Sequence, residues 1–204
     1  SDKEQIAKHD IGLVSNYYAG NFGGSLTQYA LYNVLMKMGY SVLMIEHPKD
    51  CASRTNLDSM NNIYLEIPYP KKDMAPMYET RQEMYSLNSI CDSFVVGSDQ
   101  LFQYTLYQMM GKMVSLDWVQ DSKQKIAYAA SFGHGHIWGD KKELQEMKYF
   151  LQKYDAFSVR ENQAVEICRN EFGVDAEWVL DPVFLCDKEC FMRLANKSQV
   201  KWKE

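Results

Sequence analysis

The chain has 204 residues, of which 46% are hydrophobic and 24% charged, and its formal net charge is −5. These proportions are typical of a globular protein, and the length allows one large domain, or one domain with part of a second. The negative net charge and the lack of a Lys/Arg-rich run argue against a nucleic-acid partner. No apolar run approaches about 20 residues, so we expect no membrane-spanning helix.

The N-terminus and the cysteines indicate where the protein works. The first ten residues, SDKEQIAKHD, are polar and contain neither an initiating Met nor a signal-peptide core, so we expect a processed or cut chain. The five cysteines are scattered and show no CxxC spacing of a zinc or redox site, which favours a reducing, cytoplasmic setting. Cys168 and Cys186 stand in apolar contexts, and we expect both to be small buried hydrophobes.

A strand followed by a glycine-rich turn and a helix opens the fold. Residues 11–15, IGLVS, are predicted to form the strand, and residues 26–38 the helix. Ser25, with Gln28 three residues later, has the pattern of a capping box, and Gly39 is expected to end the helix.

The turn itself predicts an anionic ligand. Its glycines allow a close approach to the backbone, and the N–H groups and dipole at the helix start favour a negative charge there. The alternative is purely structural, because a tight strand-to-helix turn needs glycine with or without a ligand. Neither GxGxxG nor GxxxxGK[ST] is present, so dinucleotides and P-loop chemistry are not indicated. The candidate ligand-binding residues here are Asn21, Gly23, Gly24 and Ser25.

The rest of the chain alternates between strand-like and helix-like patterns. Residues 46–72 look like an irregular surface excursion, and a second irregular region surrounds Trp118. Helices are predicted at residues 77–87, at residues 141–154 and at residues 162–172, the last of them before Gly173. The helix at residues 141–154 follows an Asp140–Glu143 capping box, and its apolar residues at helical spacing are Leu144, Met147, Leu151 and Tyr154. Further strands are predicted at residues 41–45, 93–97, 125–131, 156–159 and 177–180. This alternation predicts an α/β fold with a Rossmann-like parallel sheet flanked by helices.

In such a sheet, ligands bind outside the carboxyl ends of the strands. The turns that leave those ends hold most of the polar and glycine-rich residues of the chain: NYYAGNFGG, GSDQLF, SFGHGH, RENQ and DP. We therefore expect one site at this edge of the sheet.

Arg160 ends the predicted strand at residues 156–159. Its guanidinium could grip a carboxylate or phosphate with a fork of N–H donors. The alternative is a salt bridge to Glu161 or a contact with a helix terminus.

Ser98, Asp99 and Gln100 follow directly after the strand at residues 93–97. Asp99 could act as a general base or bind a sugar hydroxyl. It could equally form an Asx turn or cap a helix.

His134 and His136 follow the strand at residues 125–131. A metal site is not favoured, because a third ligand at a useful spacing is missing. A loop imidazole that gives or takes a proton fits better, and incidental loop histidines are the alternative. Asp181, which precedes Pro182, is expected only to shape a turn.

Four strings occur in order along residues 11–186: NFGGSLTQYALYNVLMKMGYSVLMIE, FVVGSDQLF, KIAYAASFG and FSVRENQAVEICRNEFGVDAEWVLDPVFL. Together they resemble the polysaccharide pyruvyl transferase family. The resemblance implies a glycosyltransferase-B-like enzyme of two Rossmann-like halves. Such enzymes transfer the enolpyruvyl group of phosphoenolpyruvate to a sugar of a glycan or its lipid-linked precursor, as a ketal.

The resemblance also assigns roles to residues. The arginine of the family's SVRE string corresponds to Arg160, which would bind phosphoenolpyruvate. The family's histidine after the SFG loop corresponds to His134 or His136. Because the reaction needs an acid and a base, we expect His134 or His136 to act as the acid and Asp99 as the acceptor-side base. The remaining candidate substrate-binding residues are Asn21, Gly23, Gly24, Ser25, Ser98, Gln100 and Glu161. The reaction requires neither a metal nor a redox cofactor.

Two departures from the family pattern stand out. Family members usually run considerably longer, so residues 1–185 would be the N-terminal domain and residues 186–204 a linker or helix toward an absent second domain. The residues after GSDQ read LFQY where an aromatic–Asn pair is typical, which leaves the acceptor contacts near Phe102 open. The alternatives are a nucleotide-sugar glycosyltransferase of similar shape, or a truncated domain that only binds a glycan. The chain could act alone or as a homo-oligomer.

Overall fold

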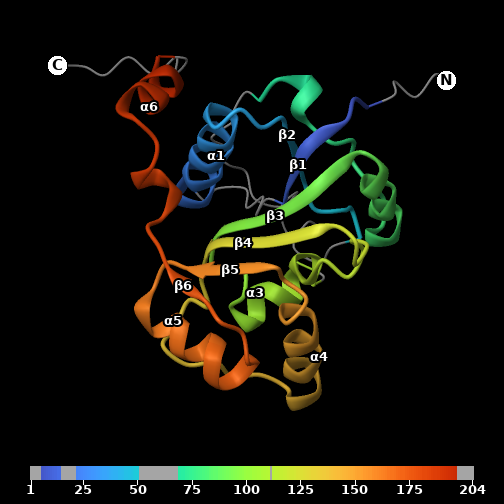
Figure 1. The fold of residues 1–204 in the computed structure, drawn as a ribbon, viewed down its shortest axis with the longest axis vertical. Coiled ribbons are helices and arrows are strands. Elements are labelled where there is room, and N and C mark those ends of the chain that lie inside the picture. The colour runs from blue at the N-terminus through green and yellow to red at the C-terminus, as the bar shows by residue number, and fades with distance from the viewer. Residues whose placement is uncertain (1–5, 15–21, 51–68, 111, 197–204) are drawn as a thin grey trace, which may run out of the picture.

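The computed structural model describes residues 6–14, 22–50, 69–110 and 112–196, and in this part six strands form one parallel sheet (Figure 1). The strand order is β2-β1-β3-β4-β5-β6. The strands are β1 His9–Val14, β2 Val42–Ile45, β3 Cys91–Asp99, β4 Gln124–Ala130, β5 Ala156–Val159 and β6 Glu177–Trp178. The predicted α/β, Rossmann-like fold class is confirmed.

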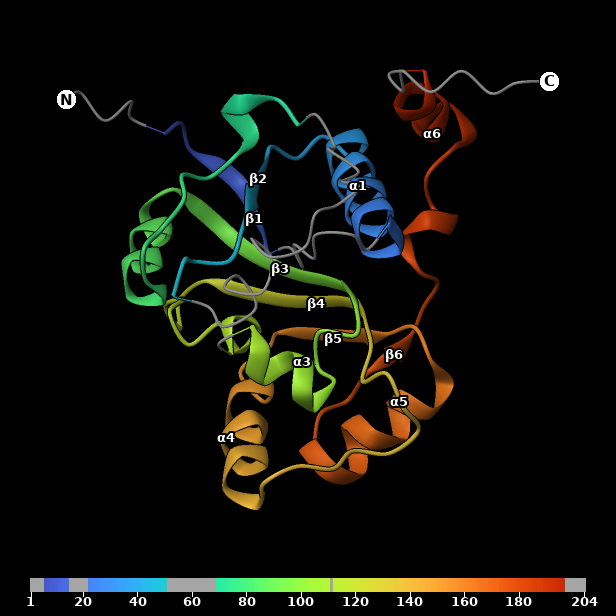
Figure 2. The same cartoon turned by 180° about the vertical axis from the view of Figure 1, so that it is seen from behind.

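Alternate residues of the strands serve two hydrophobic cores, one on each face of the sheet. Leu13 and Val95 face the core beneath α1 (Phe22–Lys37), whereas Phe94 and Val96 face the other core. That second core is covered by η2 Arg81–Ser89, α3 Tyr104–Met109, η3 Met113–Ser115, α4 Lys141–Leu151, α5 Asn162–Ile167 and η4 Cys168–Phe172 (Figure 2). Residues buried on both faces explain why these strands read as continuous apolar runs.

Helix α1 begins earlier than the sequence predicts. It starts at Phe22, so Ser25 lies inside the helix, and the predicted capping box of Ser25 and Gln28 is wrong. Gly39 ends the helix as predicted, at a φ of +98° that glycine adopts without steric cost.

The predicted cap of α4 is confirmed. The Asp140 side chain accepts hydrogen bonds from the backbone N–H groups of Lys142 at 2.9 Å and Glu143 at 3.1 Å. Met147 and Leu151 are buried in the core, as their helical spacing predicts.

Two other segments differ from the prediction. Residues 81–89 form a 3₁₀ helix where a helix over residues 77–87 was predicted. It starts later than predicted, after Thr80, whose side chain caps it by accepting from Glu83 N. Helix α3 lies in a region expected to be irregular; its cap is the side chain of Gln103, a residue type that does not indicate a helix start. Of the predicted excursion at residues 46–72, residues 51–68 lie outside the described residues, and η1 Lys71–Asp73 follows them.

The C-terminal part of the chain crosses the sheet. From β6 at one edge it passes through η5 Pro182–Phe184 and reaches α6 Lys188–Ala195, which lies beside α1 (Figure 1). Cys186 forms a disulfide with Cys190, so its prediction as a small buried hydrophobe is wrong, whereas Cys168 is buried with a free thiol as expected. In the described residues, no helix has the length and apolar character needed to cross a membrane.

Candidate functional site

The carboxyl ends of β3, β4 and β5 are tied together by backbone hydrogen bonds. Ser131 N donates to Asp99 O at 3.0 Å, and Arg160 N donates to Ala130 O at 3.1 Å. These bonds bring the GSDQ, SFG and RENQ turns side by side, and the side chains of Asp99 and Arg160 meet. The structure thus gathers at one edge the turns that the topology rule assigned there.

An irregularity in β4 lies directly beneath this edge. The register between β4 and β5 shifts between Ala127 and Ala130, and Ala129 has a φ of +50°. The buried Ser158 hydroxyl accepts from Ala129 N at 3.0 Å and donates to Ala127 O at 3.1 Å. The Ala129 N–H and the Ala127 carbonyl, which the bulge would leave unpaired, thereby have hydrogen-bond partners.

Asp99 also has an unusual backbone conformation. Its φ is +135°, in a region that costs a residue other than glycine about 1–3 kcal/mol. Its side chain accepts from Gln100 N at 2.8 Å, a bond to the next residue and not the bond two residues on that defines an Asx turn. Strain of this kind persists only where the surrounding structure holds it, and here the bond from Ser131 N does so.

The Arg160 guanidinium is surrounded by carboxylates. Nε lies 3.2 Å from Glu161 Oε1, Nη1 lies 2.8 Å from Asp181 Oδ2 and Nη2 lies 3.4 Å from Asp99 Oδ1. The salt bridge to Glu161 considered from the sequence is therefore present. Burial alone would lower the pKa of Arg160, but the hydrogen bond to Asp181 and the charges of Asp99 and Asp181 raise it above its usual value. The arginine is always charged, and it has three carboxylates around it.

The Asp181 carboxylate connects the other residues of the site through hydrogen bonds, a role that its sequence position did not reveal. Its Oδ2 accepts from Arg160 Nη1 at 2.8 Å and from Ser98 Oγ at 3.1 Å. Its Oδ1 accepts from Val183 N at 3.1 Å and from Thr27 Oγ1 at 3.4 Å. The only sequence signal was the DP dipeptide just beyond the last predicted strand, at the same edge as the other turns.

The start of α1 joins the site through Thr27. Ser25 is half-buried and Gly24 buried in the first turns of this helix, whereas Gly23 is exposed, and Asn21 lies outside the described residues. Because Thr27 and Arg160 bind the same carboxylate, the helix start and the guanidinium lie at the same end of the sheet.

The two histidines form an exposed ring cluster with Trp138. The ring centroids of His134 and His136 lie 4.7 Å and 4.9 Å from that of Trp138. Gly133, with a φ of +75°, turns this loop against the side chains of Gln100 and Gln103, so a Cβ there would be only 3.1 Å from Gln100 Oε1. Trp138 was not predicted as a site residue. The rings of Trp138, His134 and His136, together with the side-chain amides of Gln100 and Gln103, form a polar, aromatic surface. Gln100 directly follows Asp99 in the chain.

No group of three or more His, Cys, Asp or Glu side chains among the described residues is arranged to hold a metal ion.

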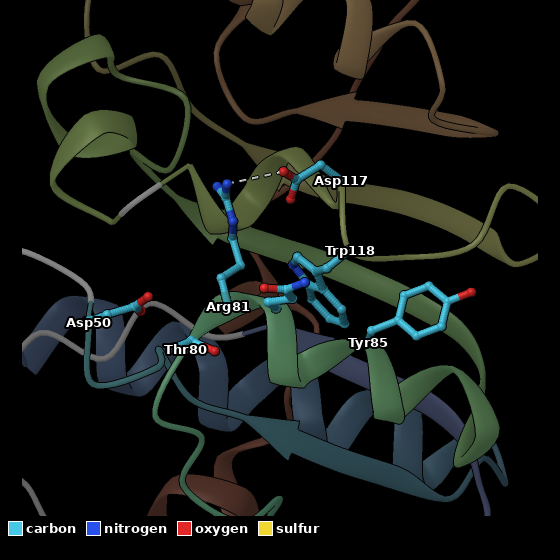
Figure 3. Close-up of a pocket in the computed structure, with 7 residues that line it drawn as sticks. Asp50, Thr80, Arg81, Tyr85, Asp117 and Trp118 are labelled. Carbon is cyan, nitrogen blue, oxygen red and sulfur yellow. Dashed lines mark ion pairs between the residues drawn. The ribbon is translucent and has the colours of Figure 1, made fainter.

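A separate hollow of about 780 Å³ lies beside η2 (Figure 3). Arg81 points toward Asp117 there, with Nη2 and Oδ2 3.2 Å apart. Asp50 adds a second carboxylate, so the charged side chains of the lining carry a net negative charge that disfavours an anion. None of the predicted site residues lines this hollow; its lining is Asp50, Thr80, Arg81, Gln82, Tyr85, Asp117 and Trp118.

Comparison with known proteins gives one match. A family model described as polysaccharide pyruvyl transferase matches residues 21–204. No curated protein and no solved structure matches the chain.

Proposed function

The chain belongs to the polysaccharide pyruvyl transferase family, and from this premise we propose that it binds phosphoenolpyruvate at Arg160 and transfers pyruvate from it to a sugar as a ketal. The observation that carries the proposal is the meeting of Arg160, Asp99, Ser98 and the start of α1 at the carboxyl edge of a parallel sheet.

The donor needs strong anion recognition, because it carries a phosphate and a carboxylate. Arg160 offers a planar fork of N–H donors, and its raised pKa keeps it charged at every working pH. The positive end of the α1 dipole lies at the same end of the sheet and favours negative charge. These features support a donor site on the β5 side of the edge.

The chemistry needs one acid and one base. A proton is delivered to the methylene carbon of phosphoenolpyruvate, and C2 becomes electrophilic. A first sugar hydroxyl attacks C2 as a base takes its proton, and the C2–O bond to phosphate breaks. A second hydroxyl then attacks C2 and closes the ketal, and its proton leaves with inorganic phosphate. We assign the acid to His134 or His136 and the base to Asp99. Groups of this kind typically contribute about 10²–10⁴-fold to the rate.

The acceptor sugar has a suitable surface beside the donor. The exposed indole of Trp138 and the imidazoles packed on it can stack on the apolar face of a sugar ring. Gln100 and Gln103 lie against the same loop and can hydrogen-bond to sugar hydroxyls. We therefore place the acceptor, a glycan or a lipid-linked sugar, over residues 133–138.

The proposal extends to the organisation of the enzyme. Residues 1–185 would act as the Rossmann-like N-terminal half of a glycosyltransferase-B-like pair, and residues 186–204 would lead toward the other half.

The test is the release of inorganic phosphate from phosphoenolpyruvate by the protein expressed from its complete gene, with a panel of sugar acceptors. Arg160→Ala should lower kcat/KM by at least about 100-fold, because a charged group bound to the donor is lost. Arg169→Ala, at an exposed arginine on η4, is the matched control and should leave activity unchanged.

Two results would contradict the proposal. One is an Arg160→Ala variant that keeps both donor affinity and turnover. The other is release of a nucleotide from a nucleotide sugar without release of phosphate from phosphoenolpyruvate. If His134→Gln and His136→Gln each keep full activity, the acid is neither of these residues.

A further inference from the structure

The Asp181 carboxylate is bound as an anionic ligand would be. Three of its partners stand on separate elements of the fold: Thr27 on α1, Ser98 on β3 and Arg160 at the end of β5. The fourth partner, Val183 N, belongs to the same segment as Asp181 and would move with it. We call these three donors the cradle; they belong to elements of the fold other than the segment that carries Asp181.

The cradle suits a planar carboxylate. Ser98 is fully buried, and its single hydroxyl proton has two acceptors, Ala129 O at 2.9 Å and Asp181 Oδ2 at 3.1 Å. The hydroxyl can therefore hold an anion at Oδ2 while its own position is fixed by β4. Arg160 approaches the same oxygen, and Thr27 approaches the other one.

The segment that carries Asp181 is held less firmly than the cradle. We call residues 180–185 the strap; they cross from β6 toward α1 at the edge of the sheet (Figure 1). Leu180 is 61% exposed and Phe184 is 73% exposed, so these apolar side chains add little burial. Pro182 is buried and the Tyr128 hydroxyl donates to Leu180 O at 3.3 Å. The strap packs against α1 and is held by the bonds of Asp181, but it contributes few buried apolar side chains, so it is expected to open at a lower free energy than the sheet.

The charges around Arg160 argue against simple addition of an anion. Asp99, Glu161 and Asp181 already surround the single positive charge, so a further anion would meet strong repulsion if all three stayed in place. Exchange of the Asp181 carboxylate for the carboxylate of a ligand removes one negative charge for each one that it adds there, so only the ligand's phosphate adds negative charge beside Arg160.

We propose that the cradle of Thr27, Ser98 and Arg160 is the subsite for the carboxylate of the donor, and that Asp181 and its strap leave it when the donor binds. This inference rests on the proposed function, because it names the subsite that the donor would occupy. Asp181 thereby acts as a competitor that sets the donor's affinity.

A different role for Asp181 predicts the opposite sign. If the carboxylate only positioned Arg160, its removal would weaken donor binding. If it competes with the donor, its removal strengthens binding.

The experiment is isothermal titration of phosphoenolpyruvate, pyruvate and inorganic phosphate into the protein and its variants. Asp181→Asn keeps the shape of the side chain and removes its charge. We expect at least about tenfold tighter binding of phosphoenolpyruvate and of pyruvate, which shares the carboxylate, and a smaller change for inorganic phosphate. Glu177→Gln is the matched control, because it removes an exposed carboxylate on β6 that lies outside the strap and has no role in the proposed site. Its effect should stay below about threefold.

Limited proteolysis of the unmodified protein gives a second readout that needs no variant. Phosphoenolpyruvate should speed chymotryptic cleavage after Leu180, Phe184 or Leu185, because the strap leaves the sheet when the donor binds. Slower or unchanged cleavage at saturating donor overturns the inference.

The outcomes separate the inference from the proposed function. If phosphoenolpyruvate binds and Asp181→Asn binds it equally or more weakly, the inference is overturned while the donor site at Arg160 stands. If neither the unmodified protein nor Asp181→Asn binds phosphoenolpyruvate, and Arg160→Ala has the same activity as the unmodified protein, the proposed function fails and the inference fails with it.

Discussion

Replacing Ser158 with alanine should destabilise the protein by about 2–3 kcal/mol, because this hydroxyl holds the irregular part of β4. Ser158 is 8% exposed and Ala129 is fully buried. The substitution removes the acceptor for Ala129 N and a donor to Ala127 O, and it creates little empty volume. A buried N–H group left without a partner costs about 1–3 kcal/mol, and the lost bond to Ala127 O adds to that cost.

The assay is urea unfolding, followed by circular dichroism and by tryptophan fluorescence. We expect a lower midpoint with an unchanged m-value, since the surface exposed on unfolding is the same. Ser93→Ala is the control: its hydroxyl makes one exposed bond to Asp10 O at 2.9 Å, and its loss should cost about 0.5 kcal/mol or less. Equal costs for the two variants would refute the idea that the Ser158 hydroxyl holds the bulge.

Four further predictions concern the core, the thiols and a helix cap. Phe102→Ala should cost about 3–5 kcal/mol, because the ring is fully buried; thermal unfolding measures this, and a cost below about 1 kcal/mol would contradict the packing. Burial raises the pKa of the Cys91 and Cys168 thiols to about 12, so both should resist iodoacetamide at about pH 8 until urea unfolds the chain, as read by mass spectrometry; rapid labelling of the folded protein would contradict this. These thiol pKa values are higher in the folded state, so the contribution of the two thiols to folding stability is complete below about pH 8.5 and is lost as the pH rises toward about 12. The urea midpoint should therefore fall over that pH range, and a midpoint that does not change with pH would contradict the raised pKa values. Asp140→Ala should cost about 1 kcal/mol through the lost cap of α4, against no measurable change for Lys141→Ala at the exposed neighbour.

The sequence predicts the sheet well because the information for it is local. Strands buried on both faces read as short apolar runs, and the prediction for β5 at residues 156–159 matches the structure residue for residue. The carboxyl ends of parallel strands must lie at one edge, so the sequence also places Arg160 and Asp99 together. The start of α1 is less predictable, because glycines at the helix start hide its boundary.

The role of Asp181 could not be predicted, because it depends on the path of the chain in three dimensions. Thr27, Ser98, Arg160 and Asp181 are far apart in the sequence, and no local pattern tells which turn reaches over the others. The DP dipeptide predicts a turn, which the structure contains, since the Asp181 side chain caps η5. Only the crossing of the strap toward α1 brings the carboxylate to Arg160. The ring cluster at Trp138 is likewise a tertiary feature.

The most direct test of the donor site is nuclear magnetic resonance of the arginine side chains during titration with phosphoenolpyruvate. Each arginine Nε–H group gives its own signal, so the residue that binds the anion is identified without any mutation. The account predicts that the Arg160 signal shifts and saturates, while the signals of Arg81 and Arg169 stay in place. A shift of the Arg81 signal, at the hollow beside η2, with an unmoved Arg160 signal would contradict it.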